Sequence, residues 1–194
     1  MKNEEKQSFR VGTECVVNIE ATSADAVVQG WDQSEVQVVG SAEQVCVNQD
    51  GQTLSIRPSF SHSTDLIVRV PRQCDVNLHL VSGDASLQDI HGEITIQTMS
   101  GDIIAKNVQG SVHVYSVSGD IILSSSRLHD LTVDTVSGDV TIESELDPEG
   151  NYRVRTVSGD LRLRIPEDQR CTVVCHSLSG EFESSLPYES KHSG

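Results

Sequence analysis

The chain has 194 residues, of which 36% are hydrophobic, and a formal net charge of −15 at pH 7. Such a surface repels phosphate backbones and anionic headgroups, which argues against nucleic acid as a partner. No stretch approaches about 18 apolar residues, and the N-terminal MKNEEKQSF lacks an apolar signal region, so we expect no membrane insertion. A cytoplasmic location follows by default for the chain as given, or a cell-surface location if it is a fragment of a longer protein.

The N-terminal part of the chain alternates apolar and polar residues without a clear repeat. We expect residues 1–7 to be disordered. Alternation typical of strands then follows in Val36/Val38, Val45/Val47, Leu54/Ile56 and Leu66/Val68/Val70. Residues 8–75 are therefore predicted to be either a less regular part of a larger stack or a small β-cap.

A repeat begins near residue 76. Glycine recurs every nine residues at Gly83, Gly92, Gly101, Gly110 and Gly119, and an alternating apolar pair follows each one. These pairs are Ala85/Leu87, Ile94/Ile96, Ile103/Ala105, Val112/Val114 and Ile121/Leu123, and the pattern continues with small insertions to Phe182. Nine residues suit one strand of about five residues and one tight turn.

Two such halves make a coil that returns to its starting point one strand spacing further along. We therefore predict an all-β, single-stranded parallel β-helix or β-solenoid with about 18–21 residues per coil. A right-handed coil is expected, because parallel crossovers prefer that hand. The solenoid should form one domain over residues 8–187, regular over 76–187, with a flexible tail at 188–194.

Two other folds share part of this pattern. An antiparallel sandwich also has short strands at regular intervals, but it does not need the same turn sequence at every second corner. Nonapeptide calcium rolls share the period, yet their GGxGxD turn is absent, because here Asp follows Gly directly.

The sequence VSGD, with small variations, marks every second corner. Glycine permits a positive φ there, and neighbouring Ser and Asp side chains can hydrogen-bond the backbone of a tight turn. The predicted structural turn residues are Ser82, Gly83, Ser100, Gly101, Ser118, Gly119, Ser137, Gly138, Ser158, Gly159, Ser179 and Gly180.

The carboxylates of these corners have a second interpretation. If coils are about 4.8 Å apart, the carboxylates line up where like charges repel, and the column would attract cations such as Ca²⁺ unless backbone amides neutralise it. The residues of this candidate cation column are Asp84, Asp102, Asp120, Asp139 and Asp160, with Glu181 continuing the line.

Other polar groups do not form a recognisable site. The histidines at 91 and 129 are expected at equivalent corners with Gln109 between them, too far apart to share a metal. The five cysteines are odd in number, lack CxxC spacing and are interpreted as reduced, buried thiols. No nucleophile elbow or phosphate-binding loop is present, so we expect neither catalysis nor a cofactor.

Two outward positions are unexpectedly apolar. Ile104 and Ile122 are one coil apart on the outer strand face and form a small apolar patch, the predicted partner surface. The last coil is a second candidate surface, because unpaired solenoid edges invite strand addition or end-to-end association.

The segment LIVRVPRQCDVNLHLVSGD (66–84), followed by SGDIxL-type coils, resembles a bacterial domain family of unknown function named "putative adhesin". The similarity covers about residues 8–187. It implies a single-stranded parallel β-helix, and related domains occur in envelope-stress and surface-associated proteins. The motif is specific for the fold and not for an activity.

These observations favour a non-enzymatic binding or scaffolding module of the "putative adhesin" type that contacts a protein partner or a second copy of itself. The alternative is a structural β-helix that polymerises end to end, as bactofilins do.

Overall fold

The computed structural model describes residues 6–12, 14–39, 44–59, 65–166, 169 and 171–185. Of the segment 1–7 that was expected to be disordered, residues 1–5 lie outside the described residues, whereas Lys6 and Gln7 belong to the first strand and correct that expectation. The expected tail at 188–194 also lies outside the described residues. Strands dominate the described chain, which contains no helix and thus no helical candidate for a membrane span. The strands are β1 (Lys6–Arg10), β2 (Cys15–Ser23), β3 (Ala26–Trp31), β4 (Glu35–Val39), β5 (Val45–Asp50), β6 (Thr53–Pro58), β7 (Leu66–Pro71), β8 (Cys74–Ser82), β9 (Ala85–Gln88), β10 (His91–Ser100), β11 (Ile103–Lys106), β12 (Gln109–Ser118), β13 (Ile121–Ser137), β14 (Val140–Ser158), β15 (Leu161–Arg164), β16 (Val173–Ser179) and β17 (Phe182–Ser184).

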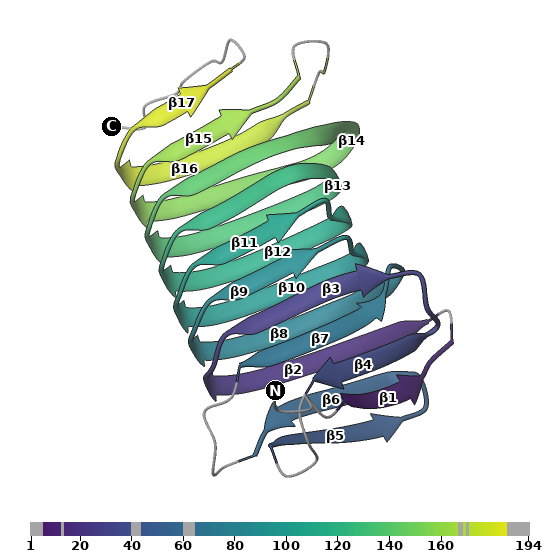
Figure 1. The fold of residues 1–194 in the computed structure, drawn as a ribbon. Helices are drawn as coiled ribbons and strands as arrows, with labels where there is room; N and C mark the ends of the chain where they lie inside the picture. Colours follow the sequence, from purple (N-terminus) through teal and green to yellow (C-terminus); the bar gives the residue numbers. More distant parts are fainter. Residues whose placement is uncertain are drawn as a thin grey trace, which may run out of the picture.

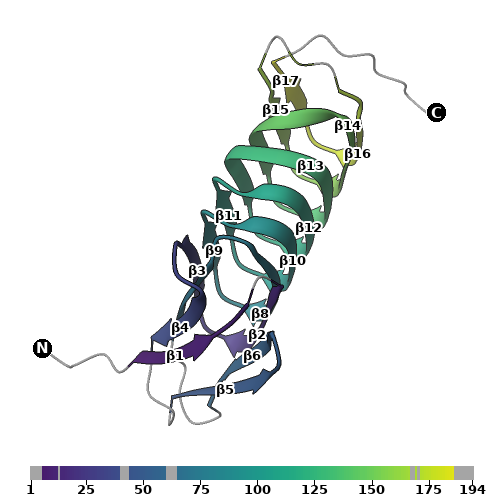
Figure 2. The same ribbon diagram turned by 90° about the vertical axis from the view of Figure 1, so that its right-hand side faces the viewer.

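The regular part of the molecule is a parallel β-solenoid, as the glycine period predicts. Each coil has a longer strand that ends at an SGD corner and a second strand that leaves it. The strands β8, β10 and β12 pair in parallel on one wall, while β9, β11 and the first part of β13 pair on the other. Figure 1 shows the strands of successive coils side by side along the length of the molecule, and Figure 2 shows the coils following one another along a single long axis.

The two walls enclose a thin apolar core. Ile94 and Ile96 on β10 face inward toward the wall that carries Ile103 and Ala105, and all four side chains are buried. The same alternation recurs in every coil because successive residues of a strand point to opposite faces. The predicted inward pairs from Ala85/Leu87 to Leu161/Leu163 are accordingly buried, whereas Val173, Cys175 and Phe182 of the last coil are only partly buried.

The N-terminal region does not stack in the order of the sequence. The first coil, β2 and β3, pairs with β8 and β9 on one side and with β6 and β7 on the other, in parallel throughout. The chain therefore leaves the first coil, builds the layer beneath it, and returns above it. Antiparallel pairs β1–β4, β4–β7 and β5–β6 close this end of the stack. Residues 8–75 thus include both parts of the stack and a cap.

The second corner of each coil lies elsewhere than the nine-residue glycine period predicts. The residues with positive φ between the two walls are Asp89 (59°), Asn107 (52°) and Ser125 (51°), while Gly92 and Gly110 lie inside β10 and β12. Asp89 and Asn107 are also linked by a side-chain hydrogen bond. Asp and Asn tolerate the left-handed region better than most residues, so the bend itself does not need glycine. Gly92 and Gly110, with φ values of 158° and 112°, lie at the start of the strand that follows the bend.

Candidate functional site

The SGD corners form a continuous hydrogen-bonded ladder along one edge of the solenoid. The backbone N–H of Asp102 donates to Oδ1 of Asp84 at 2.9 Å, and Asp120 donates to Asp102 in the same way. Contacts of 2.9–3.0 Å continue through Asp139, Asp160 and Glu181. Each aspartate therefore fixes the corner of the next coil, which supports the structural role predicted for it.

The glycine of each corner is required by the stacking. Gly101 has a φ of +129°, and a Cβ there would lie 2.1 Å from the carbonyl oxygen of Gly83 in the coil below. Side chains are thus excluded both by backbone conformation and by space. Because corners stack directly, the same constraint recurs in each regular coil.

The ladder begins one rung earlier than sequence inspection indicated. Asp84 donates its backbone N–H to Oδ1 of Asp25 at 2.9 Å, and Ser23 is in register with Ser82. The first corner is therefore Ser23-Ala24-Asp25, in which alanine replaces glycine. The alternating pair Ala26/Val28 that follows was the available signal.

The carboxylates of this ladder are already engaged by protein groups. Besides the backbone contacts, Arg162 donates to Asp139 at 3.1 Å and to Asp160 at 3.2 Å. No group of three or more potential metal-ligating side chains occurs among the described residues. Cation binding by the column stays a prediction, and the geometry accounts for the column as a corner device.

The predicted isoleucine patch lies on the outer face of the wall that contains β11 and β13. Ile104 and Ile122 are in register on neighbouring strands, with 44% and 39% of their surfaces exposed. Their next neighbours in the column are polar, Ser86 on β9 and Thr141 on β14. The patch is therefore two side chains wide, and Ser86 separates it from Val27 and Ile67, which are exposed by 40% and 39% in the same column.

A longer apolar stripe runs beside the SGD corners, on the face of the solenoid that does not carry Ile104 and Ile122. Sequence inspection missed it. It consists of the residue that precedes each serine of the repeated motif. These side chains are exposed by 45–84% and are Val81, Met99, Val117, Val136, Val157 and Leu178. The first letter of VSGD was the signal, because strand alternation turns this position outward when the residue before it faces the core.

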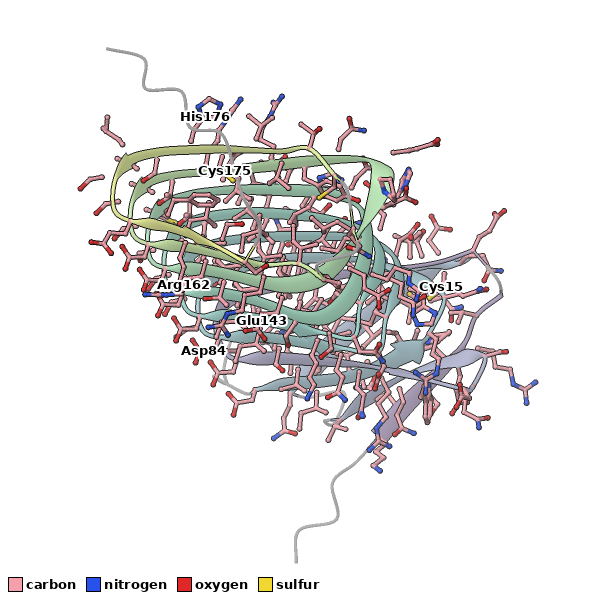
Figure 3. All side chains as sticks on the ribbon, turned by 90° about the horizontal axis from the view of Figure 1, so that it is seen from above. Cys15, Asp84, Glu143, Arg162, Cys175 and His176 are labelled. Atoms are coloured by element: carbon pink, nitrogen blue, oxygen red, sulfur yellow. The ribbon has the colours of Figure 1, made fainter. Side chains whose placement is uncertain are left out.

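The stripe lines a groove along the solenoid axis with a volume of about 1790 Å³. Its other wall is a column of outward side chains from successive coils, Glu20, His79, Gln97, Tyr115, Asp134, Arg155 and His176. Pro58 and Ser59, at and after the end of β6, contribute to its lining. In Figure 3, His176 lies on the outer face opposite to that of Arg162 and Glu143, so the groove and the isoleucine patch occupy different faces.

The floor of the groove is built from buried hydroxyl groups. Thr98 donates to the carbonyl of Ser100 at 3.1 Å, and Thr156 donates to Ser158 at 3.2 Å. Ser116 makes the equivalent bond to Ser118. A hydroxyl that bonds the backbone two residues later stabilises a bend. These contacts therefore help the chain to turn at the SGD corners beside the groove.

Charges on the groove wall are paired locally. Arg57 lies 2.9 Å from Glu20, and Arg155 lies 3.9 Å from Asp134. The strong negative charge of the whole chain is therefore not concentrated on this wall. The groove presents apolar side chains beside balanced polar ones.

A cluster of Ser111, His129, Asp130 and Asp147 does not have the geometry of a nucleophilic triad. His129 Nδ1 lies 3.4 Å from Asp147, while the Ser111 hydroxyl lies 3.5 Å from Asp130. The register also corrects the expected position of His129: Gln109 pairs with Arg127, and His129 lies in an irregularity of the ladder, so it is not in the column of His91. Bonds from Asn151 lower the pKa of Asp130, and the Glu149 N–H lowers that of Asp147.

Sequence comparison identifies the family. The profile of the family described as Toastrack DUF4097 matches residues 11–145 and 61–194. The chain belongs to the Toastrack DUF4097 family. No curated protein is significantly similar to this Toastrack chain.

Solved structures resemble this Toastrack chain over nearly its whole length. A "putative adhesin" from Bacteroides fragilis has a TM-score of 0.57 and 14% identity, covering 95% of this chain and 98% of its own. A "putative adhesin" from Parabacteroides distasonis has a TM-score of 0.48 and 12% identity, covering 92% and 96%. A "putative lipid binding protein" from the same species has a TM-score of 0.37 and 12% identity, covering 95% and 98%. At these identities the first similarity establishes the fold alone.

Proposed function

We propose that the protein is a non-enzymatic binding module that holds an extended protein segment along the groove. The observation that carries the proposal is the stripe of six exposed apolar side chains from Val81 to Leu178. Monomeric proteins seldom expose an apolar surface in one continuous line unless something binds there. At about 4.8 Å per coil the stripe is about 24 Å long, which an extended segment of about seven residues would cover.

The form of the groove favours a polypeptide over a fatty acyl chain. The groove runs in the open along the wall, and its floor and second wall contain hydroxyl, amide and charged groups. An acyl chain in such a groove would leave much of its length in water and would satisfy none of these groups. A peptide offers apolar side chains to the stripe and polar groups to the opposite wall.

Recognition would depend on side chains and not on strand addition. The strands that line the groove run across it, and the coils above and below already pair with their backbones. Free strand edges belong to the ends of the stack. The ligand segment would therefore lie perpendicular to the strands, unlike a segment added to a sheet edge.

The two ends of the stack favour a module over an end-to-end polymer. Antiparallel strands β1, β4 and β5 close the N-terminal end, whereas the C-terminal end finishes in the parallel coil of β16 and β17. If the N-terminal end of a second copy stacked on the last coil, its antiparallel strands would meet parallel ones, and the two ends would not continue one regular sheet. Light scattering over a range of concentrations tests this point, and oligomers that grow with concentration would contradict it.

The groove is tested with two matched double variants. Peptides of eight residues displayed on a carrier protein are selected against the wild-type chain, and calorimetry then measures their affinity. Val117→Asp/Val136→Asp places two charges in the groove, while Ile104→Asp/Ile122→Asp places the same charges on the other face. We expect the groove variant to lose at least about tenfold in affinity, or about 1.4 kcal/mol, and the control variant to keep it.

Equal losses in both variants would place the peptide elsewhere, and a selection that enriches no peptide would contradict a polypeptide ligand. All four substituted positions are exposed, so each variant is expected to fold. Circular dichroism of both variants checks that expectation.

A further inference from the structure

Two buried cysteines far apart in the sequence lie side by side near the N-terminal end of the solenoid. Cys15 is the first residue of β2 and Cys74 the first residue of β8, and the two are in register on neighbouring parallel strands. Their Sγ atoms are 2.9 Å apart, and the two residues are only 2% and 3% exposed. In Figure 3, Cys15 lies at the end of the coil opposite to Asp84.

This arrangement satisfies the main geometric requirement for a disulfide bond. Facing residues of adjacent strands have Cα atoms about 4.8 Å apart, within the range of about 4.4–6.8 Å found for bridged cysteines. The two sulfurs are within about 1 Å of the bonding distance of about 2.05 Å. A rotation of the side chains would therefore close the bond without moving a strand.

The other cysteines do not share this environment. Cys46 is exposed, and Cys171 and Cys175 are partly buried at the opposite end of the stack. All five cysteines are free thiols in this structure. The register of β2 and β8 thus selects one pair from the five, although the pair is 59 residues apart in the sequence.

We propose that Cys15 and Cys74 are a redox site that forms a disulfide bond by exchange with an external disulfide. The thiolate of one cysteine attacks the external disulfide, giving a mixed disulfide and one released thiol. The second cysteine then attacks the sulfur of the first, forming the Cys15–Cys74 bond and releasing the second thiol. Two electrons pass to the external disulfide, and the protons of the two cysteines end on the released thiols.

The environment favours Cys15 as the first nucleophile. A hydrogen bond from the Cys74 thiol lowers the pKa of Cys15, while the same bond, burial and the charge of Asp75 raise the pKa of Cys74. Burial and Asp75 oppose the shift of the pKa at Cys15. Because the two residues are only 2% and 3% exposed, exchange needs a local opening. Both residues are the first of their strands, so the opening need separate only the starts of β2 and β8.

The bond would join β2 of the first coil to β8, where the regular coils begin, and so fix the N-terminal layers to the rest of the solenoid. Its loop contains β3, which completes the first coil, and β4 to β7, which build the layer beneath it and the antiparallel cap. A cross-link that closes such a long loop constrains the unfolded chain strongly. We expect the oxidised protein to unfold at a temperature roughly 5–10 °C above that of the reduced protein.

Thiol counting in denaturant tests the site directly. The full chain is incubated with oxidised glutathione, excess reagent is removed, and free thiols are titrated. We expect Cys15 and Cys74 both to disappear from the free thiols, with a loss of two hydrogen atoms in the intact mass apart from any glutathione adduct on the exposed Cys46. Digestion without reductant should give a single linked peptide pair, which contains Cys15 and Cys74. Five remaining thiols, or a linkage through another cysteine, would overturn the proposal.

Two variants separate this bond from general oxidation. Cys46→Ser/Cys171→Ser/Cys175→Ser should still lose both remaining thiols and keep the rise in unfolding temperature. Cys15→Ser/Cys74→Ser should show no rise on oxidation. If the latter variant does not fold, Cys15→Ala/Cys74→Ala, which leaves no polar group in the core, replaces it; a rise in that variant would also contradict the assignment.

Discussion

The carboxylate of Asp120 accepts a hydrogen bond of 2.9 Å from the backbone N–H of Asp139, its counterpart one coil further along the chain. The same aspartate donates its own N–H to Asp102 in the coil below. Asp120 alone thus links three successive coils. The repeated SGD motif is consequently a device for stacking, and the groove that we propose as a binding site lies beside it.

Replacing Asp120 tests one rung of this ladder. Asp120→Ala removes the acceptor for the Asp139 N–H, and since the corner is exposed, water will replace part of the lost bond. We expect a loss of about 1 kcal/mol in the free energy of unfolding. Asp120→Asn retains an oxygen acceptor without the charge and should lose less than half as much. Urea titration measures both, and an equal loss in the two variants would show that charge and not the hydrogen bond matters.

Glycine substitutions test the close approach of neighbouring corners. Gly119 has a φ of +116°, and a Cβ there would lie 2.2 Å from the carbonyl oxygen of Gly101. Gly51 is also left-handed, with a φ of +60°, but nothing lies within 4 Å of its Cβ position. Gly51→Ala should therefore cost about 1–2 kcal/mol.

Gly119→Ala should cost about 4 kcal/mol or more, because it adds a backbone clash to the conformational penalty. Thermal unfolding of the two variants gives the comparison. Similar losses at both positions would mean that the corners separate easily, which would contradict close stacking.

The sequence predicted the regular solenoid well because two independent signals agreed. Glycine recurred at fixed intervals, and the pairs after it, such as Ile94 and Ile96, alternated with polar residues. Stacked coils have nearly the same environment, so each repeat carries the same constraint. The structure confirms both the parallel stacking and the inward direction of these pairs.

The parts that sequence reasoning missed have no comparable repetition. Nothing in residues 32–73 indicates that β6 and β7 lie beneath β2 and β3, since that order depends on long-range pairing. The second corner uses Asp89, Asn107 and Ser125, three different residue types in one conformation. The apolar stripe is visible in the sequence as the first letter of VSGD, but one apolar residue per coil becomes a surface only when the coils are stacked.

Adjacent isoleucines test which face of the wall is the core. Ile121 is fully buried, whereas its neighbour Ile122 is 39% exposed. Ile121→Ala should cost about 2–5 kcal/mol, because the two walls cannot close fully around the cavity. Ile122→Ala should change stability by no more than about 0.5 kcal/mol. Chemical unfolding measures both, and a reversed order would contradict the assigned strand faces.

The acid sensitivity of one rung follows from the environment of Asp139. The N–H of Asp160 and then the guanidinium of Arg162 lower the pKa of Asp139 below its ordinary value of 3.8. A carboxyl whose pKa is lower in the folded state stabilises the protein above its unfolded-state pKa, and the contribution is lost as the pH falls through the folded-state value. Asp139→Asn should therefore reduce stability more at about pH 7 than at about pH 3.

The size of this effect is limited by solvent. The Asp139 side chain is 43% exposed, so water and salt screen its contact with Arg162, and we expect the variant to lose no more than about 1 kcal/mol near neutral pH. Comparing wild type and variant at each pH cancels the contributions of Asp130 and Asp147, whose pKa values are also lowered. Urea unfolding at several pH values provides the measurement. A stability difference that does not change with pH would show that the charge of Asp139 contributes nothing, leaving its role to the shape of the corner alone.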